Sequence, residues 1–112
     1  MTRVLIVDDS SAVRAYVRAA LEAADELEAE VEEAVNGFEA LRVLPRESFD
    51  LLILDINMPN IHGLELISML RRSERYSATP VLVISTETLQ TAVMITLFRK
   101  DCANGTSSKT VR

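Results

Sequence analysis

The chain has 112 residues and a mass of 12.4 kDa, which is the size of one ordinary domain. We therefore expect a single domain over residues 1–112 and any effector in another chain. A composition of 48% apolar and 26% charged residues excludes disordered and collagen-like classes. No apolar run approaches the roughly 18 residues of a membrane helix, no secretory leader is evident, and Cys102 has no partner cysteine, so we expect a cytoplasmic protein.

The formal net charge of −5 is unevenly distributed. Residues 22–33 contain seven acidic residues and no basic one, and the rest of the chain has a small basic excess. We expect this segment to form a solvated surface without a ligand. Direct nucleic-acid binding is not expected, because it requires a basic stripe.

Three continuous aliphatic runs predict buried strands. They are residues 4–7, 51–54 and 81–84, and each is followed by a polar residue. Continuous runs are typical of parallel strands covered on both faces. Between residues 27 and 32, apolar and glutamate residues alternate, which predicts a strand at the edge of the sheet.

Helical patterns separate these runs. The first is an apolar stripe that Ser10 or Ser11 can cap, formed by Val13, Tyr16, Val17, Ala20 and Leu21. A short helix is expected between Gly37 and Pro45, and another from Gly63 to about Arg72. A fourth, less regular helix is expected from Leu89, Met94, Leu97 and Phe98. The alternation of strands and helices predicts a doubly wound α/β fold with a parallel sheet.

Four polar side chains follow the predicted parallel strands: Asp8, Asp9, Asp55 and Ser85. The carboxyl ends of such strands lie at one edge of the sheet, where ligands bind. Three converging carboxylates repel one another, so a cation is implied, and hard oxygen ligands favour Mg²⁺. Capping of the next helices is an alternative role for such residues, but no helix follows Asp55 directly.

A carboxylate beside Mg²⁺ can be the nucleophile in phosphoryl transfer. The reaction also needs a hydroxyl and a cation that hold the phosphoryl oxygens. Ser85 can supply the hydroxyl, and either Lys109 or Lys100 can supply the cation.

The chain resembles the receiver domains of two-component response regulators, which are CheY-like. The matching segments are residues 4–10 (VLIVDDS), 33–41 (EAVNGFEAL), 50–59 (DLLILDINMP), 63–66 (GLEL) and 80–85 (PVLVIS). The resemblance covers residues 2 to about 90 and implies a flavodoxin-like sheet of about five strands in the order 2-1-3-4-5. It also implies that a sensor histidine kinase or phosphotransfer protein phosphorylates the domain.

The resemblance assigns roles to individual residues. Asp55 corresponds to the phosphoacceptor, and Asp9 and Asp55 to direct Mg²⁺ ligands. Asp8 corresponds to a ligand acting through water, and the backbone carbonyl of Asn57 completes the metal site. Ser85 corresponds to the switch hydroxyl.

The C-terminal residues 88–112 are atypical for the family. The best alignment selects Lys109 over Lys100 as the phosphate-binding lysine. It places Thr106 where the family has a switch aromatic and Thr110 where it has proline. The fifth strand would be unusually polar, and we expect the fifth helix to be missing.

His62 and Cys102 are weaker candidates. His62 follows the phosphoacceptor strand, which suggests a metal or phosphorelay role, but a solvated loop residue is the preferred interpretation. Cys102 has no paired cysteine or histidine at ligand spacing, so we expect an unreactive thiol.

The sequence therefore predicts a phosphorylation-dependent switch of protein–protein contacts that is not an enzyme beyond its own phosphorylation and dephosphorylation. The downstream protein is unknown, no membrane partner is expected, and a homodimer is left open. One alternative is a degenerate receiver that acts as an interaction module without switching. Another is a Mg²⁺-dependent phosphatase with an aspartate nucleophile, although the adjacent Asp8 and Asp9 lack the Asp-x-Asp spacing of haloacid-dehalogenase-like enzymes.

Overall fold

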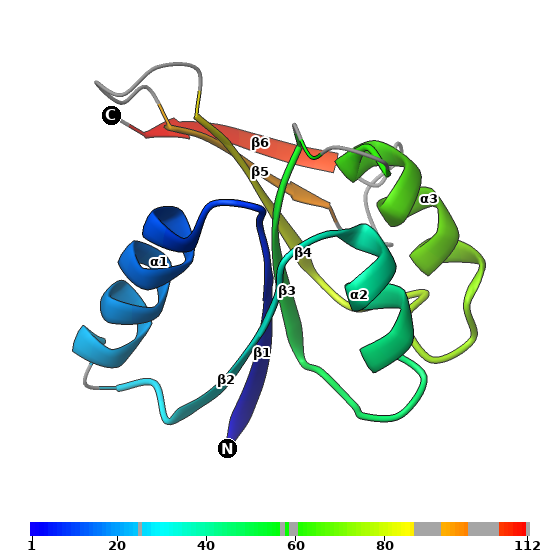
Figure 1. Ribbon diagram of the computed structural model, residues 1–112, viewed down its shortest axis with the longest axis horizontal. Helices are drawn as coiled ribbons and strands as arrows, with labels where there is room; N and C mark the ends of the chain where they lie inside the picture. The colour runs from blue at the N-terminus through cyan, green and yellow to red at the C-terminus, as the bar shows by residue number, and fades with distance from the viewer. Residues whose placement is uncertain (25, 57, 59–60, 87–92, 99–105, 112) are drawn as a thin grey trace.

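A computed structural model describes residues 1–24, 26–56, 58, 61–86, 93–98 and 106–111, with the backbone alone from residue 85 onward. Its strands form one sheet in the order β2-β1-β3-β4-β5-β6 (Figure 1). The four parallel strands are β1 (Thr2–Val7), β2 (Ala29–Ala34), β3 (Leu51–Asp55) and β4 (Val81–Thr86). The helices are α1 (Ser11–Ala23), α2 (Gly37–Val43) and α3 (Gly63–Arg72).

The helices cover both faces of the sheet, with α1 on one face and α2 and α3 on the other (Figure 1). The predicted flavodoxin-like arrangement with parallel order 2-1-3-4 is confirmed. Strand β2 lies at the edge, as its sequence predicted, and its exposed Glu30 and Glu32 alternate with half-buried Ala29 and Val31. Glu30 and Glu32 therefore occupy positions that face solvent.

Each helix starts at a side-chain cap. The Ser10 hydroxyl accepts a hydrogen bond from the amide of Val13 (3.3 Å), which decides between the two predicted caps of α1. Asn36 Oδ1 accepts one from the amide of Glu39 (2.8 Å) at the start of α2. These bonds satisfy amides that the first helical turn leaves without a backbone partner.

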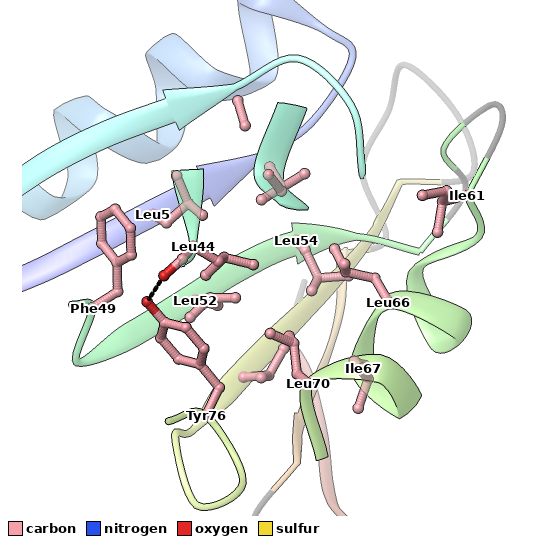
Figure 2. Packing of buried hydrophobic residues seen from close by; sticks show 14 of the residues in the cluster. Leu5, Leu44, Phe49, Leu52, Leu54, Ile61, Leu66, Ile67, Leu70 and Tyr76 are labelled. Carbon is pink, nitrogen blue, oxygen red and sulfur yellow. Dashed lines mark hydrogen bonds between the residues drawn. The ribbon is translucent and has the colours of Figure 1, made fainter. Parts of the chain in front are cut away.

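The larger core lies between the sheet and the two helices α2 and α3. Its fully buried members include Leu5, Leu52, Leu54 and Leu66, each at most 1% exposed. Tyr76 closes one end of this core, and its hydroxyl donates a hydrogen bond to the carbonyl of Leu44 at 2.6 Å (Figure 2). This bond joins the segment after α3 to the end of α2.

The core beneath α1 is smaller, and the predicted stripe of α1 is only partly buried. Val17 is buried against the sheet, and Val13 and Leu21 are half-buried. The prediction that the apolar stripe of α1 includes Tyr16 and Ala20 was wrong, because Tyr16 is 76% exposed and Ala20 is also exposed. A single helix on this face touches the sheet along a narrow line, so residues at its flanks stay in solvent.

The prediction of a fourth helix was wrong for the described part of residues 89–98. Val93–Phe98 forms β5, which pairs antiparallel with β4. Five of the six residues of this strand are apolar, and their backbone groups bond to an otherwise open edge of β4. Thr106–Val111, which contains the expected fifth strand, forms β6 on the far side of β5. Residues 87–92 lie outside the described residues.

None of the described helices is long and apolar enough to cross a bilayer.

Candidate functional site

Strand register brings the predicted aspartates together at the carboxyl edge of the sheet. Val7 pairs with Leu54, so Asp8 and Asp55 follow side by side on the central strands β1 and β3. Carboxylate oxygens of Asp8, Asp9 and Asp55 all lie within 4.8 Å of one another. Asp8 and Asp55 are buried, and Asp9 is exposed.

The electrostatics at Asp8 reflect its burial and its acidic neighbours. The pKa of the Asp8 carboxyl is raised to about 6, mainly by burial and also by the charges of Asp55 and Asp9, while a hydrogen bond from the Ser10 amide and the charge of Arg14 act in the opposite direction. That amide donates to Asp8 Oδ1 at 2.8 Å. A divalent cation among the three carboxylates would remove the repulsion.

The start of α3 packs directly against the end of β3. The amide of Gly63 donates to the carbonyl of Ile56 at 3.1 Å. A Cβ atom at Gly63 would lie 2.8 Å from the Asp55 carbonyl oxygen and from Ile56 Cα, so only glycine permits this approach. The sequence indicated Gly63 only as a helix start, because a close backbone contact leaves no further pattern.

His62 caps α3, a role the sequence did not predict. Its Nδ1 accepts a hydrogen bond from the amide of Leu64 at 3.2 Å. The side chain is exposed, in agreement with the preferred interpretation of a solvated residue. The hydrogen bond accounts for its position without a metal or phosphorelay role.

The backbone of Ser85 lies beside the aspartate cluster. Asp55 pairs with Ile84, and the amide of Ile56 donates to the Ile84 carbonyl at 3.2 Å, so Ser85 follows next to Ile56. Its side chain lies outside what the structure describes, and its predicted role stays a prediction.

Lys109 lies level with Asp55 across the sheet. Asp55 pairs with Ile84 on β4, Ile84 with Ile95 on β5, and Ile95 with Lys109 on β6. Three strand spacings separate the two backbones, roughly 14 Å. In the predicted strand order 2-1-3-4-5, only two spacings separated Asp55 from Lys109, because the strand of Lys109 was expected directly beside β4. The role of Lys109 stays a prediction, and its side chain is not described.

Two other predicted positions fall outside the described residues. These are Asn57, whose carbonyl was predicted to complete the metal site, and Lys100, the alternative lysine. The neighbouring Met58 is buried in the larger core.

The expectation that residues 22–33 form only a solvated surface was wrong for Glu33. Its carboxylate pairs with Arg14 (2.9 Å) and Arg18 (2.7 Å) of α1, and hydrogen bonds from Arg18 and Arg14 lower its pKa. A second guanidinium nitrogen of Arg14 donates to the carbonyl of Asp8 at 2.6 Å. The network therefore links β2 to α1 and to the edge of the site.

The donor set fits a hard divalent cation. It consists of carboxylate oxygens from three aspartates, and one of them is open to solvent, which leaves room for water ligands. Mg²⁺ binds to one or two carboxylates and retains several waters. The same arrangement leaves Asp55 close to any anion that the cation attracts.

Comparisons with known proteins agree with this geometry. The family described as "Response regulator receiver domain" matches residues 4–111. A chemotaxis protein CheY homologue of Campylobacter jejuni is 36% identical over 86 residues, which cover 76% of this chain and 65% of that protein. The structure of the chemotaxis response regulator CheY4 of Vibrio cholerae has a TM-score of 0.70 at 41% identity, covering 79% of this chain and 71% of that one.

Longer proteins contain a similar region. The protein-glutamate methylesterase/protein-glutamine glutaminase of Trichodesmium erythraeum is 40% identical over 91 residues, 81% of this chain and 25% of that protein. The chain thus spans less than two thirds of the length of these curated relatives. The family match and the CheY relatives together show that this chain belongs to the response regulator receiver domain family.

Proposed function

We propose that this receiver domain accepts a phosphoryl group on Asp55 in a Mg²⁺-dependent reaction. The observation that carries the proposal is the convergence of Asp8, Asp9 and Asp55 within 4.8 Å at the carboxyl edge of a receiver-type sheet. Asp8, Asp9 and Asp55, with the Asn57 carbonyl, would hold Mg²⁺. When bound, the cation neutralises charge that develops on the phosphoryl oxygens.

The phosphoryl group would come from a phosphohistidine on a sensor histidine kinase or phosphotransfer protein. A carboxylate oxygen of Asp55 attacks phosphorus, an O–P bond forms, and the P–N bond to imidazole breaks. The imidazole nitrogen leaves with the bonding electrons and takes up a proton. Water later hydrolyses the acyl phosphate, so the domain acts only on its own modification and is not an enzyme for other substrates.

Burial of Asp55 supports this role. The residue is 8% exposed, so its carboxylate is largely desolvated, and the exposed Asp9 beside it marks the open side of the site. Ser85 follows the adjacent strand and would hydrogen-bond a phosphoryl oxygen, with Lys109 as the proposed cationic contact. Charge at Asp55 would then bias Ser85 and the following segment between two arrangements and so switch protein–protein contacts.

The proposed partners are a cytoplasmic kinase or phosphotransfer protein and a downstream protein. The names of two curated relatives support this proposal. One is a chemotaxis protein CheY homologue, and the other is the CAI-1 autoinducer sensor kinase/phosphatase of Vibrio cholerae. We expect neither direct nucleic-acid contact nor a membrane partner, and a homodimer stays open.

Beryllofluoride, a phosphoryl analogue, tests the assignment. We expect it to bind only with Mg²⁺, to perturb the amides around Asp8 and Asp55 in NMR spectra, and to fail with Asp55→Asn. The matched control is Asp50→Asn, because Asp50 is an exposed aspartate that directly precedes the same strand. It should bind as the unmodified protein does.

Two outcomes would overturn the proposal. Absence of beryllofluoride binding at any Mg²⁺ concentration would favour an interaction module without switching. The placement of β5 between β4 and the strand of Lys109 is the observation that favours that second candidate. Turnover of small phosphate esters would favour the phosphatase alternative.

A further inference from the structure

Arg14 connects the aspartate site with α1 and β2. It lies near the start of α1, and its side chain is 13% exposed. Its Nε donates to a carboxylate oxygen of Glu33 at 2.9 Å, and its Nη1 donates to the main-chain carbonyl of Asp8 at 2.6 Å. Because the guanidinium group is planar and rigid, the ion pair with Glu33 also fixes the direction of the bond to Asp8.

The Asp8 carbonyl belongs to the peptide group that joins Asp8 to Asp9. This group is planar, so a hydrogen bond to its oxygen restricts rotation of the whole unit and the direction in which the Asp9 side chain points. Other bonds hold the Asp8 side of this turn: the Asp8 amide donates to the Ala34 carbonyl (3.1 Å), and Asp8 Oδ1 accepts from the Ser10 amide (2.8 Å). Asp9 is exposed, so its place in the cluster depends on its backbone.

We propose that Arg14 is a positioning residue for the Mg²⁺ site and that, through the Asp8 carbonyl, it holds the Asp9 carboxylate where this group can bind the ion. The inference rests on the proposed Mg²⁺ site, and Arg14 itself does not touch the ion. Mg²⁺ demands nearly ideal octahedral geometry, so its affinity decreases when one carboxylate is held less firmly. Replacement of a residue that orients a metal ligand commonly lowers metal affinity roughly ten- to hundredfold.

The charge of Arg14 alone would have the opposite effect on the metal. A guanidinium group beside the carboxylates repels a second cation, so its removal would strengthen Mg²⁺ binding if charge were its whole contribution. Glu33 offsets part of this charge, because its carboxylate pairs with both Arg14 (2.9 Å) and Arg18 (2.7 Å). The sign of the change in Mg²⁺ affinity therefore separates a positioning role from an electrostatic one.

Arg18 provides a matched control on the same helix. It lies one helical turn after Arg14 and pairs with the same carboxylate of Glu33. Its second contact differs, because a guanidinium nitrogen of Arg18 donates to the carbonyl of Val31 (3.3 Å), in the middle of β2. Arg18→Gln therefore removes an ion pair of Glu33 and leaves the bond from Arg14 to Asp8 in place.

Titration of the full chain with Mg²⁺ at constant ionic strength, followed by amide resonances in NMR spectra, tests the proposal. We expect Arg14→Gln to weaken Mg²⁺ binding about tenfold and Arg18→Gln to change it by less than about twofold. Arg14→Lys should weaken binding less than Arg14→Gln, because lysine keeps the charge but lacks the rigid fork that makes both bonds. Arg14→Gln should weaken Ca²⁺ binding less than Mg²⁺ binding, since Ca²⁺ accepts a more flexible geometry.

The Asp9 amide provides a second measurement that needs no metal. Its nitrogen belongs to the peptide group whose oxygen accepts the bond from Arg14, so its resonance should shift in Arg14→Gln and stay in place in Arg18→Gln. Both variants lose an ion pair with Glu33, so a general loss of stability would affect the two alike. The pair of variants therefore distinguishes positioning from stability.

Unchanged or tighter Mg²⁺ binding by Arg14→Gln would overturn the proposal, and so would an equal loss of affinity in Arg18→Gln. If Arg14→Gln does not fold, Arg14→Lys takes its place, and an unchanged Mg²⁺ affinity in that variant would overturn the proposal as well. Absence of Mg²⁺ binding by the unmodified protein would overturn the proposed metal site itself and this inference with it. The other outcomes leave the proposed site intact, so the two failures are distinguishable.

Discussion

At the scale of single residues, Asp8 shows the conflict between stability and the metal site. A buried carboxylate beside two others is unfavourable when ionised, and the pKa of Asp8 is raised to about 6 from an ordinary value of 3.8. For an acid, a raised folded-state pKa means that the native protein binds more protons than the unfolded chain between these values. Stability therefore decreases as pH rises from about 4 to 6, and the full cost remains above pH 6.

Asp8→Asn removes this cost in the absence of metal. At pH 7.5 in a chelator, we expect the variant to be more stable than the unmodified protein by on the order of 1–2 kcal/mol, after allowance for solvent screening. The gain should decrease toward pH 4, and Mg²⁺ should stabilise the unmodified protein more than the variant. Urea unfolding across this pH range measures both effects. Asp9→Asn, at an exposed position, should gain less, and a gain for Asp8→Asn that is independent of pH would contradict the explanation.

At the scale of elements, the ion pairs of Glu33 hold α1 against the edge strand β2. Two arginines of the helix share one half-buried carboxylate, and Arg14 also reaches the Asp8 carbonyl. The periodic pattern of α1 predicted the helix but not this attachment, because the partner residues are 15 and 19 positions away in the sequence. The network supplements the narrow apolar contact of α1 with the sheet.

Glu33→Gln should lower the free energy of unfolding by about 1 kcal/mol at neutral pH, since the network is partly exposed. The lowered pKa of Glu33 means that its contribution is present above the unfolded-state pKa and is lost as pH falls through the lower folded-state value. The difference between the two proteins should therefore shrink in acid and in high salt. Thermal unfolding in low and high salt checks this. The matched control is Glu32→Gln, at the exposed neighbouring position, which should have little effect.

At the scale of the whole molecule, the two faces of the sheet contribute unequally to stability. The face under α2 and α3 carries the larger core, and the face under α1 leaves Leu82 and Ile84 only half-buried. Substitutions of the same residue type on the two faces should therefore differ in cost, because the loss depends on the apolar area buried and the cavity left behind.

Leu52 and Leu82 make this comparison directly. Leu52→Ala, on β3 in the larger core, should cost about 3 kcal/mol, since Leu52 is fully buried. Leu82→Ala, on β4 beneath the face of α1, should cost less than half as much, because Leu82 is already in contact with solvent. Chemical unfolding of both variants measures the difference. Equal costs would mean that another element covers Leu82 in solution.

The sequence by itself determined the parallel strands, the first three helices and the identity of the aspartates at the carboxyl edge. These features follow from local patterns: aliphatic runs, helical periodicity, caps, and the polar residue after each strand. The edge position of β2 was also predictable, because its alternating glutamates suit a strand with one solvent-exposed face.

Only the tertiary structure decided the features that depend on contacts between distant segments. The exposure of Tyr16 follows from how little of the sheet lies under α1. The pairing of Val93–Phe98 with β4 replaced an expected helix, because an open strand edge offers hydrogen bonds that local periodicity does not register. The approach of Gly63 to Asp55 and the hydrogen bond from Tyr76 to Leu44 likewise arise where separate elements meet. Such contacts have no signature in the residues nearby in the chain, so they become visible only once the fold is assembled.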